Sequence, residues 1–218
     1  MPSTLVHVAL GGLVGCALLG VAFSPRAIAA VLAAVAAVDL DTFLGWVVLG
    51  AHRSAFHTVL LPLGLGAVVA WDAWGRETSF LRSRVGATAP RVAGVAVVAV
   101  AVAGIGPDMV TNGVNVFWPV HDQFYEVTGR TYLSDREGFV QTFVDLGNEE
   151  PVKDASLGSS KERQYYTGAD TNPDRQGEPE VTERIFPLAS SGTQLLLVAT
   201  GALVVASRVV EDVRGRRA

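Results

Sequence analysis

Long apolar runs separated by short polar breaks dominate this chain. The runs cover residues 5–23, 27–38, 56–74, 92–105 and 190–210. None of them alternates between apolar and polar residues as a half-buried strand does, so each is interpreted as a helix. A helix rises about 1.5 Å per residue, so about 20 residues cross a hydrocarbon core of about 30 Å. The pattern predicts an all-α integral membrane protein with about five transmembrane helices.

The first run could instead be a signal peptide, because it lies at the start of the chain and is broken only by His7. Signal peptides normally open with basic residues, and no basic residue precedes this run. Residues 13–16, LVGC, resemble a lipoprotein cleavage site, but the missing basic start counts against that reading too. We expect a retained transmembrane helix.

Two carboxylates, Asp39 and Asp41, follow the second run directly. An ionisable group at membrane depth costs about 2.5–3.5 kcal/mol, so the pair demands an explanation. Side chains two residues apart on an ideal α-helix point about 200° away from each other and could not face one ion. We therefore predict that the helix ends or unwinds at Asp39. The apolar residues 42–49 would then form a short second segment or continue a tilted helix.

A long polar stretch follows residue 125. Residues 130–146 carry strand-forming side chains on either side of the turn Ser-Asp-Arg-Glu-Gly and predict a short β-hairpin. Residues 148–183 are rich in Gly, Pro, Ser, Asp and Glu and read as flexible. Between residues 121 and 187 there are fourteen Asp and Glu residues against seven Lys and Arg, which makes this an acidic loop.

The composition agrees with a membrane protein and narrows the chemistry. Half of the 218 residues are hydrophobic, 17% are charged, and the mean hydropathy is +0.35. The lone Cys16 excludes an intrachain disulfide and a cysteine-rich zinc site. No block of Lys and Arg suggests nucleic acid as a partner. The expected partners are the lipid bilayer and a lipid or phosphoester substrate.

The arginines predict the orientation in the membrane. With five spans, nine of them fall on one side, which the positive-inside rule assigns to the cytoplasm. They are Arg26, Arg76, Arg82, Arg84, Arg91, Arg208, Arg214, Arg216 and Arg217. The N-terminus is then outside and the C-terminus cytoplasmic, in a multi-pass protein of the plasma membrane. Residues 1–120 would be a four-helix membrane domain, 121–187 an extracytoplasmic acidic loop, and 188–218 the fifth helix with a basic tail.

The same topology brings histidines and carboxylates to the outer face. They come from the first run, the Asp39–Asp41 pair, the HRSAFH segment at residues 52–57, and the end of the fourth run. Histidine with carboxylate suits zinc, manganese or iron, whereas carboxylate and water alone would suit magnesium. A metal with an open coordination position lowers the pKa of bound water, which suits hydrolysis. Arg53 is of the type that neutralises a phosphate.

Each residue also has a plainer interpretation. His7 could simply lie at the membrane interface, and Asp39 and Asp41 could belong to a proton or ion pathway. Asp108 follows Gly-Pro at a helix end and could make a turn or cap. His121 sits in a polar turn and is expected at the surface. The case for a site rests on convergence of the set.

These motifs resemble the YdjM-type family of membrane-bound, predicted metal-dependent hydrolases. The resemblance lies in His7, in DLD at residues 39–41, in HRSAFHT at 52–58 and in GPDMVTNGVNVFWP at 106–119. The family pattern is an N-terminal histidine, P-D-x-D, H-R-x-x-x-H-[ST], and an aspartate ahead of G-V-x-x-x-W-P. The match covers roughly residues 4–120. Val38 stands where the family usually has proline, and Gly104 where it commonly has a histidine.

Two hypotheses follow. In the first, the protein is a membrane hydrolase with a divalent metal, zinc or manganese, acting on a phosphoester or lipid-linked substrate at the outer face. His52 is then a ligand or general acid/base, Arg53 orients the substrate, and the remaining candidates are the metal ligands: His7, Asp39, Asp41, His57 and Asp108. In the second, it is a non-enzymatic membrane protein, either an ion- or proton-handling transporter or an envelope scaffold.

Overall fold

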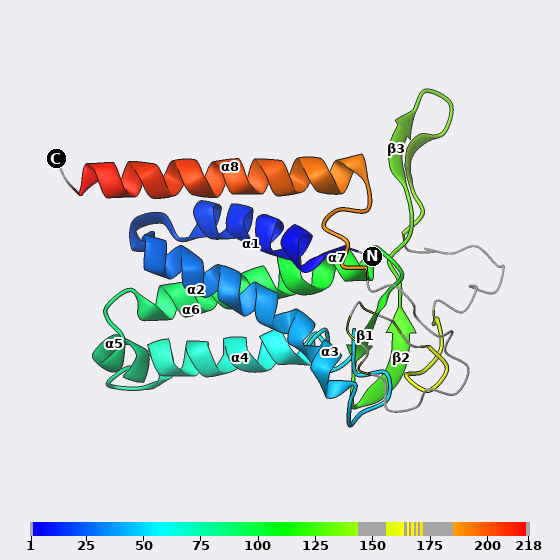
Figure 1. Ribbon diagram of the computed structural model, residues 1–218, viewed down its shortest axis with the longest axis horizontal. Helices are drawn as coiled ribbons and strands as arrows, with labels where there is room; N and C mark the ends of the chain where they lie inside the picture. The colour runs from blue at the N-terminus through cyan, green and yellow to red at the C-terminus, as the bar shows by residue number, and fades with distance from the viewer. Residues whose placement is uncertain are drawn as a thin grey trace.

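An elongated helical bundle with a small β region at one end makes up the protein in its computed structural model (Figure 1). The structure describes residues 2–143, 156–163, 165, 167, 169, 171 and 185–216. The helices are α1 (Thr4–Leu18), α2 (Pro25–Ala36), α3 (Asp41–Leu44), α4 (Leu60–Ala70), α5 (Phe80–Arg84), α6 (Ala89–Ala99), α7 (Gly106–Met109) and α8 (Gly192–Gly215).

All five predicted apolar runs form helices, but they differ in length. Three continuous helical segments are long and apolar enough to cross a membrane: Pro25–Leu44 with 20 residues, Ala89–Met109 with 21 and Gly192–Gly215 with 24. The other two, Thr4–Leu18 and Leu60–Gly75, are apolar but shorter. The structure therefore supports a helical membrane protein with three candidate spans, and the five-span topology stays a prediction.

Small residues let the helices approach closely in the core of the bundle. A Cβ on Gly15 of α1 would lie 2.5 Å from Cδ1 of Ile28 on α2. A Cβ on Gly201 of α8 would lie 2.7 Å from the carbonyl oxygen of Ala9 on α1. Close contact of this kind holds helices together in lipid, where no hydrophobic effect drives them. Apart from this contact α8 is largely exposed, with 6% of its most apolar window buried.

The two helices that carry the candidate carboxylates both depart from α geometry just before them. The α-helix of α2 ends at Ala36, and a 3-10 helix, Ala37–Leu40, carries the chain through Asp39 into α3. The prediction that the helix ends or unwinds at Asp39 is therefore wrong: the helix tightens into 3-10 geometry there and continues to Leu44. After α6 a π-helical turn, Val100–Ile105, precedes α7 and Asp108. Such turns are frequent at functional sites.

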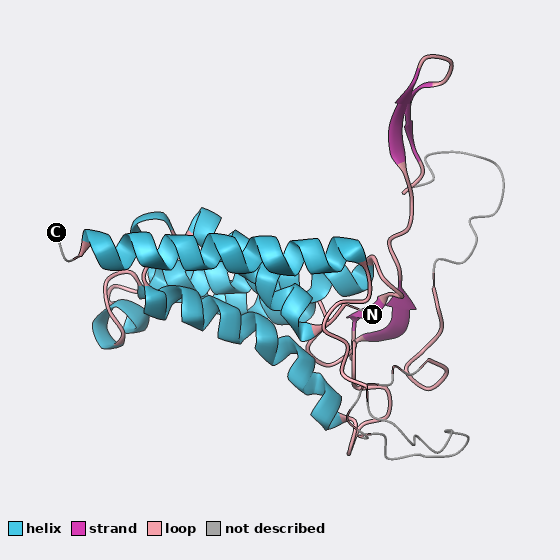
Figure 2. Cartoon of the chain, turned by 45° about the horizontal axis from the view of Figure 1, so that its top comes forward, coloured by secondary structure: helices cyan, strands magenta, loops and turns pink. Residues whose placement is uncertain are grey.

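Two antiparallel hairpins follow α7. The strands β3 (Thr131–Ser134) and β4 (Gly138–Gln141) pair as predicted, which confirms the hairpin. The strands β1 (Val114–Phe117) and β2 (His121–Tyr125) form a second pair, which the sequence analysis did not predict. Figure 2 shows both hairpins beyond the same end of the helices. The predicted flexibility of residues 148–183 concerns a stretch that lies mostly outside the described residues.

The two ends of the bundle differ in character. The N-terminus, α3, α7 and the β1–β2 pair gather at one end, and α5, the α1–α2 turn and the C-terminus lie at the other (Figure 1). The candidate histidines and carboxylates belong to the first end, whereas Arg26, Arg76, Arg82, Arg84 and Arg91 belong to segments at the second. This is the separation expected when successive helices run antiparallel.

Candidate metal centre

The candidate residues come from four separate segments that meet at the first end of the bundle. His7 comes from α1 and Asp108 from α7. The 3-10 helix and α3 supply Asp39 and Asp41, and the loop between α3 and α4 supplies the HRSAFH segment. All but two of the candidates are buried to 2% exposure or less: His7, Asp41, Arg53, His57 and Asp108. The fold therefore brings together every site residue predicted from the sequence.

Three of the predicted ligands form a group that could hold a metal ion. One ligand atom each from His7, Asp39 and Asp108 lies within 4.8 Å of the other two. Nε2 of His7 is 3.6 Å from Oδ2 of Asp108. Two carboxylates and an imidazole at this spacing are a normal partial ligand set for a divalent cation.

The backbone of the π-helical turn fixes the tautomer of His7. Nδ1 of His7 lies 2.7 Å from the carbonyl oxygen of Ala103. A carbonyl oxygen can only accept, so Nδ1 carries the proton and donates it. Nε2 is then left with its lone pair, on the side that faces Asp108. A ring held in this way is oriented as a metal-ligating histidine usually is.

His57 is held in the same manner by a side chain. Its Nδ1 lies 2.7 Å from Oδ2 of Asp41, which accepts the hydrogen bond. Its Nε2 lies 2.9 Å from Oδ2 of Asp108 and 3.7 Å from Oδ1 of Asp39. Among the described residues, no contact of this buried nitrogen, including that with Asp108, has the geometry of a hydrogen bond. His57 thus adds a fourth side chain to the group formed by the other three ligands.

A cation fits this centre better than any neutral arrangement. If His57 is neutral, the two Nε2 lone pairs and the carboxylate oxygens all point at one another, and buried groups of one sign repel strongly. Burial alone would lower the pKa of His57, but the carboxylates of Asp41 and Asp108 outweigh it and raise the pKa to about 10. The carboxylates therefore favour a positive charge at Nε2 of His57. Two imidazole nitrogens and two carboxylates match the ligands of zinc or manganese.

Asp41 lies on the far side of the His57 ring from the other carboxylates. Its Oδ1 accepts from Nδ1 of His52 at 2.8 Å, and its Oδ2 accepts from His57 and, at 3.3 Å, from the backbone N–H of Phe56. These contacts are those of a carboxylate that orients a metal-ligating histidine. The direct ligand role predicted for Asp41 stays a prediction.

Replacing Asp41 with asparagine is expected to weaken metal binding by about 10–100-fold without abolishing it, as is usual for partners that orient a ligand. The amide cannot accept from His52 and His57 with both of its ends. Affinity would be measured by competition with a chelator, with Asp122→Asn on β2 as the control. A loss as complete as that in an Asp108 variant would assign Asp41 as a ligand instead.

Arg53 supports the centre through Asp108. Its Nη2 lies 2.5 Å from Oδ1 of Asp108, and its Nη1 donates to the carbonyl oxygens of Thr111 and Gly113 at 2.6 and 3.2 Å. The guanidinium also lies over the ring of Tyr165, 4.5 Å from its centre. Since Arg53 is fully buried, it acts here by fixing one oxygen of Asp108 and leaving the other for the centre. Its role in orienting a substrate stays a prediction.

Several supporting groups escaped the sequence analysis. The hydroxyl of Thr4 donates to Oδ2 of Asp39 at 2.5 Å, and Thr42 lies 3.0 Å from Nδ1 of His52. Thr4 is one helical turn before His7, a spacing that places both on one face of α1 and could have pointed to it. The Ala103 carbonyl and Tyr165 carry no such signal in the sequence.

The two departures from the family pattern touch each other. A Cβ built on Gly104 would lie 3.0 Å from Cγ2 of Val38. A histidine at position 104 would therefore require Val38 to move. The missing side chain and the replaced proline are one local change in packing, beside the centre and not within its contacts.

Comparison with known proteins identifies a family. A family model described as YdjM inner membrane protein matches residues 1–160, a stretch that contains every candidate site residue. No curated protein and no solved structure matches the chain.

Proposed function

The chain belongs to the YdjM family of inner membrane proteins, and from this premise we propose that it is a membrane-bound, metal-dependent hydrolase. The observation that carries the proposal is the group formed by His7, Asp39 and Asp108, whose ligand atoms lie within 4.8 Å of one another, with Nε2 of His57 2.9 Å from Asp108 and 3.7 Å from Asp39. Both histidine rings turn Nε2 toward the carboxylates, which favour a positive charge there, as a bound metal ion would supply. Zinc or manganese is the metal proposed.

The residues around the centre have different proposed roles in hydrolysis. A divalent ion, when bound, supplies Lewis-acid polarisation of a substrate oxygen and acidifies water. His52 is the proposed general acid/base, because Asp41 fixes its Nδ1 proton and the side chain is 11% exposed, more than the other two histidines of the centre. Arg53 holds Asp108 in place and supplies positive charge behind it for an anionic substrate such as a phosphoester.

The surroundings of the centre support a substrate presented by the membrane. The segment that carries the carboxylates also exposes large apolar side chains, which would contact acyl chains at the bilayer surface. They are Leu40, Phe43, Trp46 and Val47, exposed by 52, 45, 61 and 79%. A lipid-linked phosphoester fits this combination. The centre would face outward, with the N-terminus outside and the C-terminus cytoplasmic, because Arg26, Arg76, Arg82, Arg84 and Arg91 lie in segments at the opposite end.

The alternative of an ion or proton pathway predicts a different arrangement. Its carboxylates would line a route through the helices, with the histidines elsewhere. The contacts of Asp41 with both His52 and His57 favour a fixed site over such a route.

The test is hydrolysis by detergent-purified protein loaded with zinc or manganese. The probes are p-nitrophenyl phosphate, bis-p-nitrophenyl phosphate and a short-chain phosphatidic acid. We expect metal-dependent turnover that falls about 100-fold or more in His52→Asn, within the range for loss of a general acid/base. His121→Asn is the matched control, because His121 is exposed and contacts Tyr125 away from the centre. Metal bound at the centre without turnover of any probe would refute this reaction class.

A further inference from the structure

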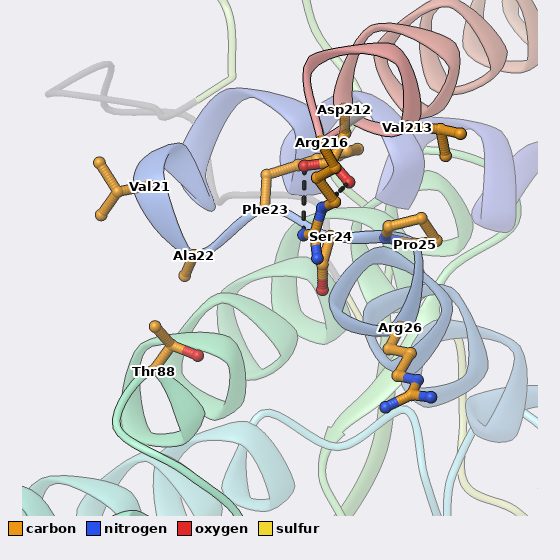
Figure 3. A pocket seen from close by; sticks show the side chains of 10 residues that line it. All are labelled: Val21, Ala22, Phe23, Ser24, Pro25, Arg26, Thr88, Asp212, Val213 and Arg216. Carbon is orange, nitrogen blue, oxygen red and sulfur yellow. Dashed lines mark hydrogen bonds and ion pairs between the residues drawn. The ribbon is translucent and has the colours of Figure 1, made fainter. Parts of the chain in front are cut away.

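A cavity of about 610 Å³ lies at the end of the bundle opposite the metal centre. Figure 3 shows it between the α1–α2 turn, the start of α6 and the end of α8. Part of its wall is apolar and comes from Val21, Phe23 and Val213. Arg26, Asp212 and Arg216 supply charge at its rim. The cavity thus offers one surface for hydrocarbon and another for a charged group.

The charge at the rim is positive overall. Arg216 donates from Nε and Nη2 to the carboxylate of Asp212, at 2.8 and 3.3 Å, which leaves three of its five N–H groups outside this pair. Arg26 is exposed and forms no ion pair within the part of the chain that the structure describes. Behind the turn, Arg91 donates to the carbonyl oxygen of Leu18, so no acid neutralises it there either. An anion at this rim would find more positive than negative partners.

Two further features suit an amphiphile. Val21 is 95% exposed at the edge of the cavity, a position that is unfavourable in water and favourable against acyl chains. The turn that bears it leads into α2, a helix of 12 residues whose N-terminus points its positive dipole end at the rim. The cavity also lies where three antiparallel helices end, which is the level of the headgroups in a bilayer.

We propose that this cavity binds the headgroup of an anionic phospholipid. The phosphate would lie against Arg26 and Arg216, and an acyl chain would run along the exposed Val21. Basic pockets between membrane helices on the cytoplasmic side are suited to anionic lipid headgroups. The proposal is independent of the metal centre, since none of the residues that carry it contacts that site.

Native mass spectrometry of the protein in detergent tests the proposal. Phosphatidylglycerol and phosphatidylcholine of the same chain length are added, and the affinity of each is measured from the bound fraction. We expect phosphatidylglycerol to bind more tightly, and its affinity to fall about 20-fold in the double variant Arg26→Gln/Arg216→Gln, from roughly fivefold for each charge. Both side chains are at the surface, so the variant should fold, which its circular dichroism spectrum and melting temperature would verify.

The double variant Arg82→Gln/Arg84→Gln is the matched control. It removes the same charge from exposed positions on α5, at the same end of the bundle but outside the cavity. An equal loss in both double variants would show attraction to the basic end as a whole and overturn the proposed site. Equal binding of phosphatidylcholine would overturn it too. Displacement of the lipid by millimolar inorganic phosphate would show a site for free anions instead of a lipid.

Discussion

Replacing Asp108 with asparagine is expected to remove stoichiometric metal from the purified protein, with a loss in affinity of more than about 100-fold, beyond the range for groups that only orient ligands. Oδ2 of Asp108 lies 2.9 and 3.6 Å from Nε2 of His57 and His7, so one carboxylate oxygen faces the Nε2 atoms of both rings. The amide keeps the shape of the side chain but removes its charge. Metal would be measured by elemental analysis after loading and gel filtration in detergent.

The control for this experiment is a carboxylate of similar setting outside the centre. Asp122 on β2 accepts hydrogen bonds from the backbone and hydroxyl of Ser160 at 3.0 and 2.8 Å and from Asn115 at 2.6 Å. Its replacement by asparagine should leave the metal content unchanged. Asp39→Ala and His57→Ala should lose metal as Asp108→Asn does. Metal retained in full by all three would mean that no metal site exists here.

The helices and the face on which the site lies could be predicted from the sequence for a simple reason. Apolar runs of helical length specify helices in lipid, and antiparallel succession then places His7, Asp39 and Asp108 at one end. The geometry at Asp39 was predicted only in part: the chain departs from α geometry there, but the helix does not end, and Asp39 and Asp41 contact different atoms of the site. The structure makes this departure a single 3-10 helix, so the chain remains helical between the two aspartates.

What the sequence could not supply depends on contacts between distant segments. The strand β1 pairs with β2, but it also meets the site loop, where Asn115 donates its backbone N–H to the carbonyl oxygen of Arg53 at 2.8 Å. Val59 donates in the same way to Val116 at 2.9 Å. This local order comes from tertiary pairing, which explains why a stretch rich in turn formers forms a strand. The contact between His7 and the carbonyl oxygen of Ala103 could not be predicted from a motif either, because every residue has a backbone carbonyl.

The burial of Arg53 changes the role expected for the arginine of the H-R-x-x-x-H motif. An arginine next to a candidate ligand suggests a group that reaches for substrate. The structure instead holds its backbone at φ 63° and directs the guanidinium inward to Asp108. The motif therefore encodes both a ligand, His57, and the cation that fixes the opposite carboxylate.

Arg53→Met is expected to destabilise the protein by about 3–5 kcal/mol, because it leaves the charge of Asp108 buried without its partner. It also removes the donors to the carbonyl oxygens of Thr111 and Gly113. For a chain of this size the melting temperature should fall by about 10 °C, from roughly 2–4 °C per kcal/mol. Thermal unfolding in detergent, followed by circular dichroism, would measure it.

Two further variants distinguish the contribution of the Arg53 hydrogen bonds to stability from the contribution of its charge. Arg53→Lys keeps the charge but cannot make the planar contacts to Asp108 and two carbonyls at once, so it should recover little of the loss. Arg82→Met on α5 removes an exposed arginine and should shift the melting temperature by no more than about 1–2 °C, as surface substitutions do. Full rescue by lysine would mean that charge is sufficient. A stable Arg53→Met variant that still binds metal would contradict the role of Arg53 as the support of Asp108.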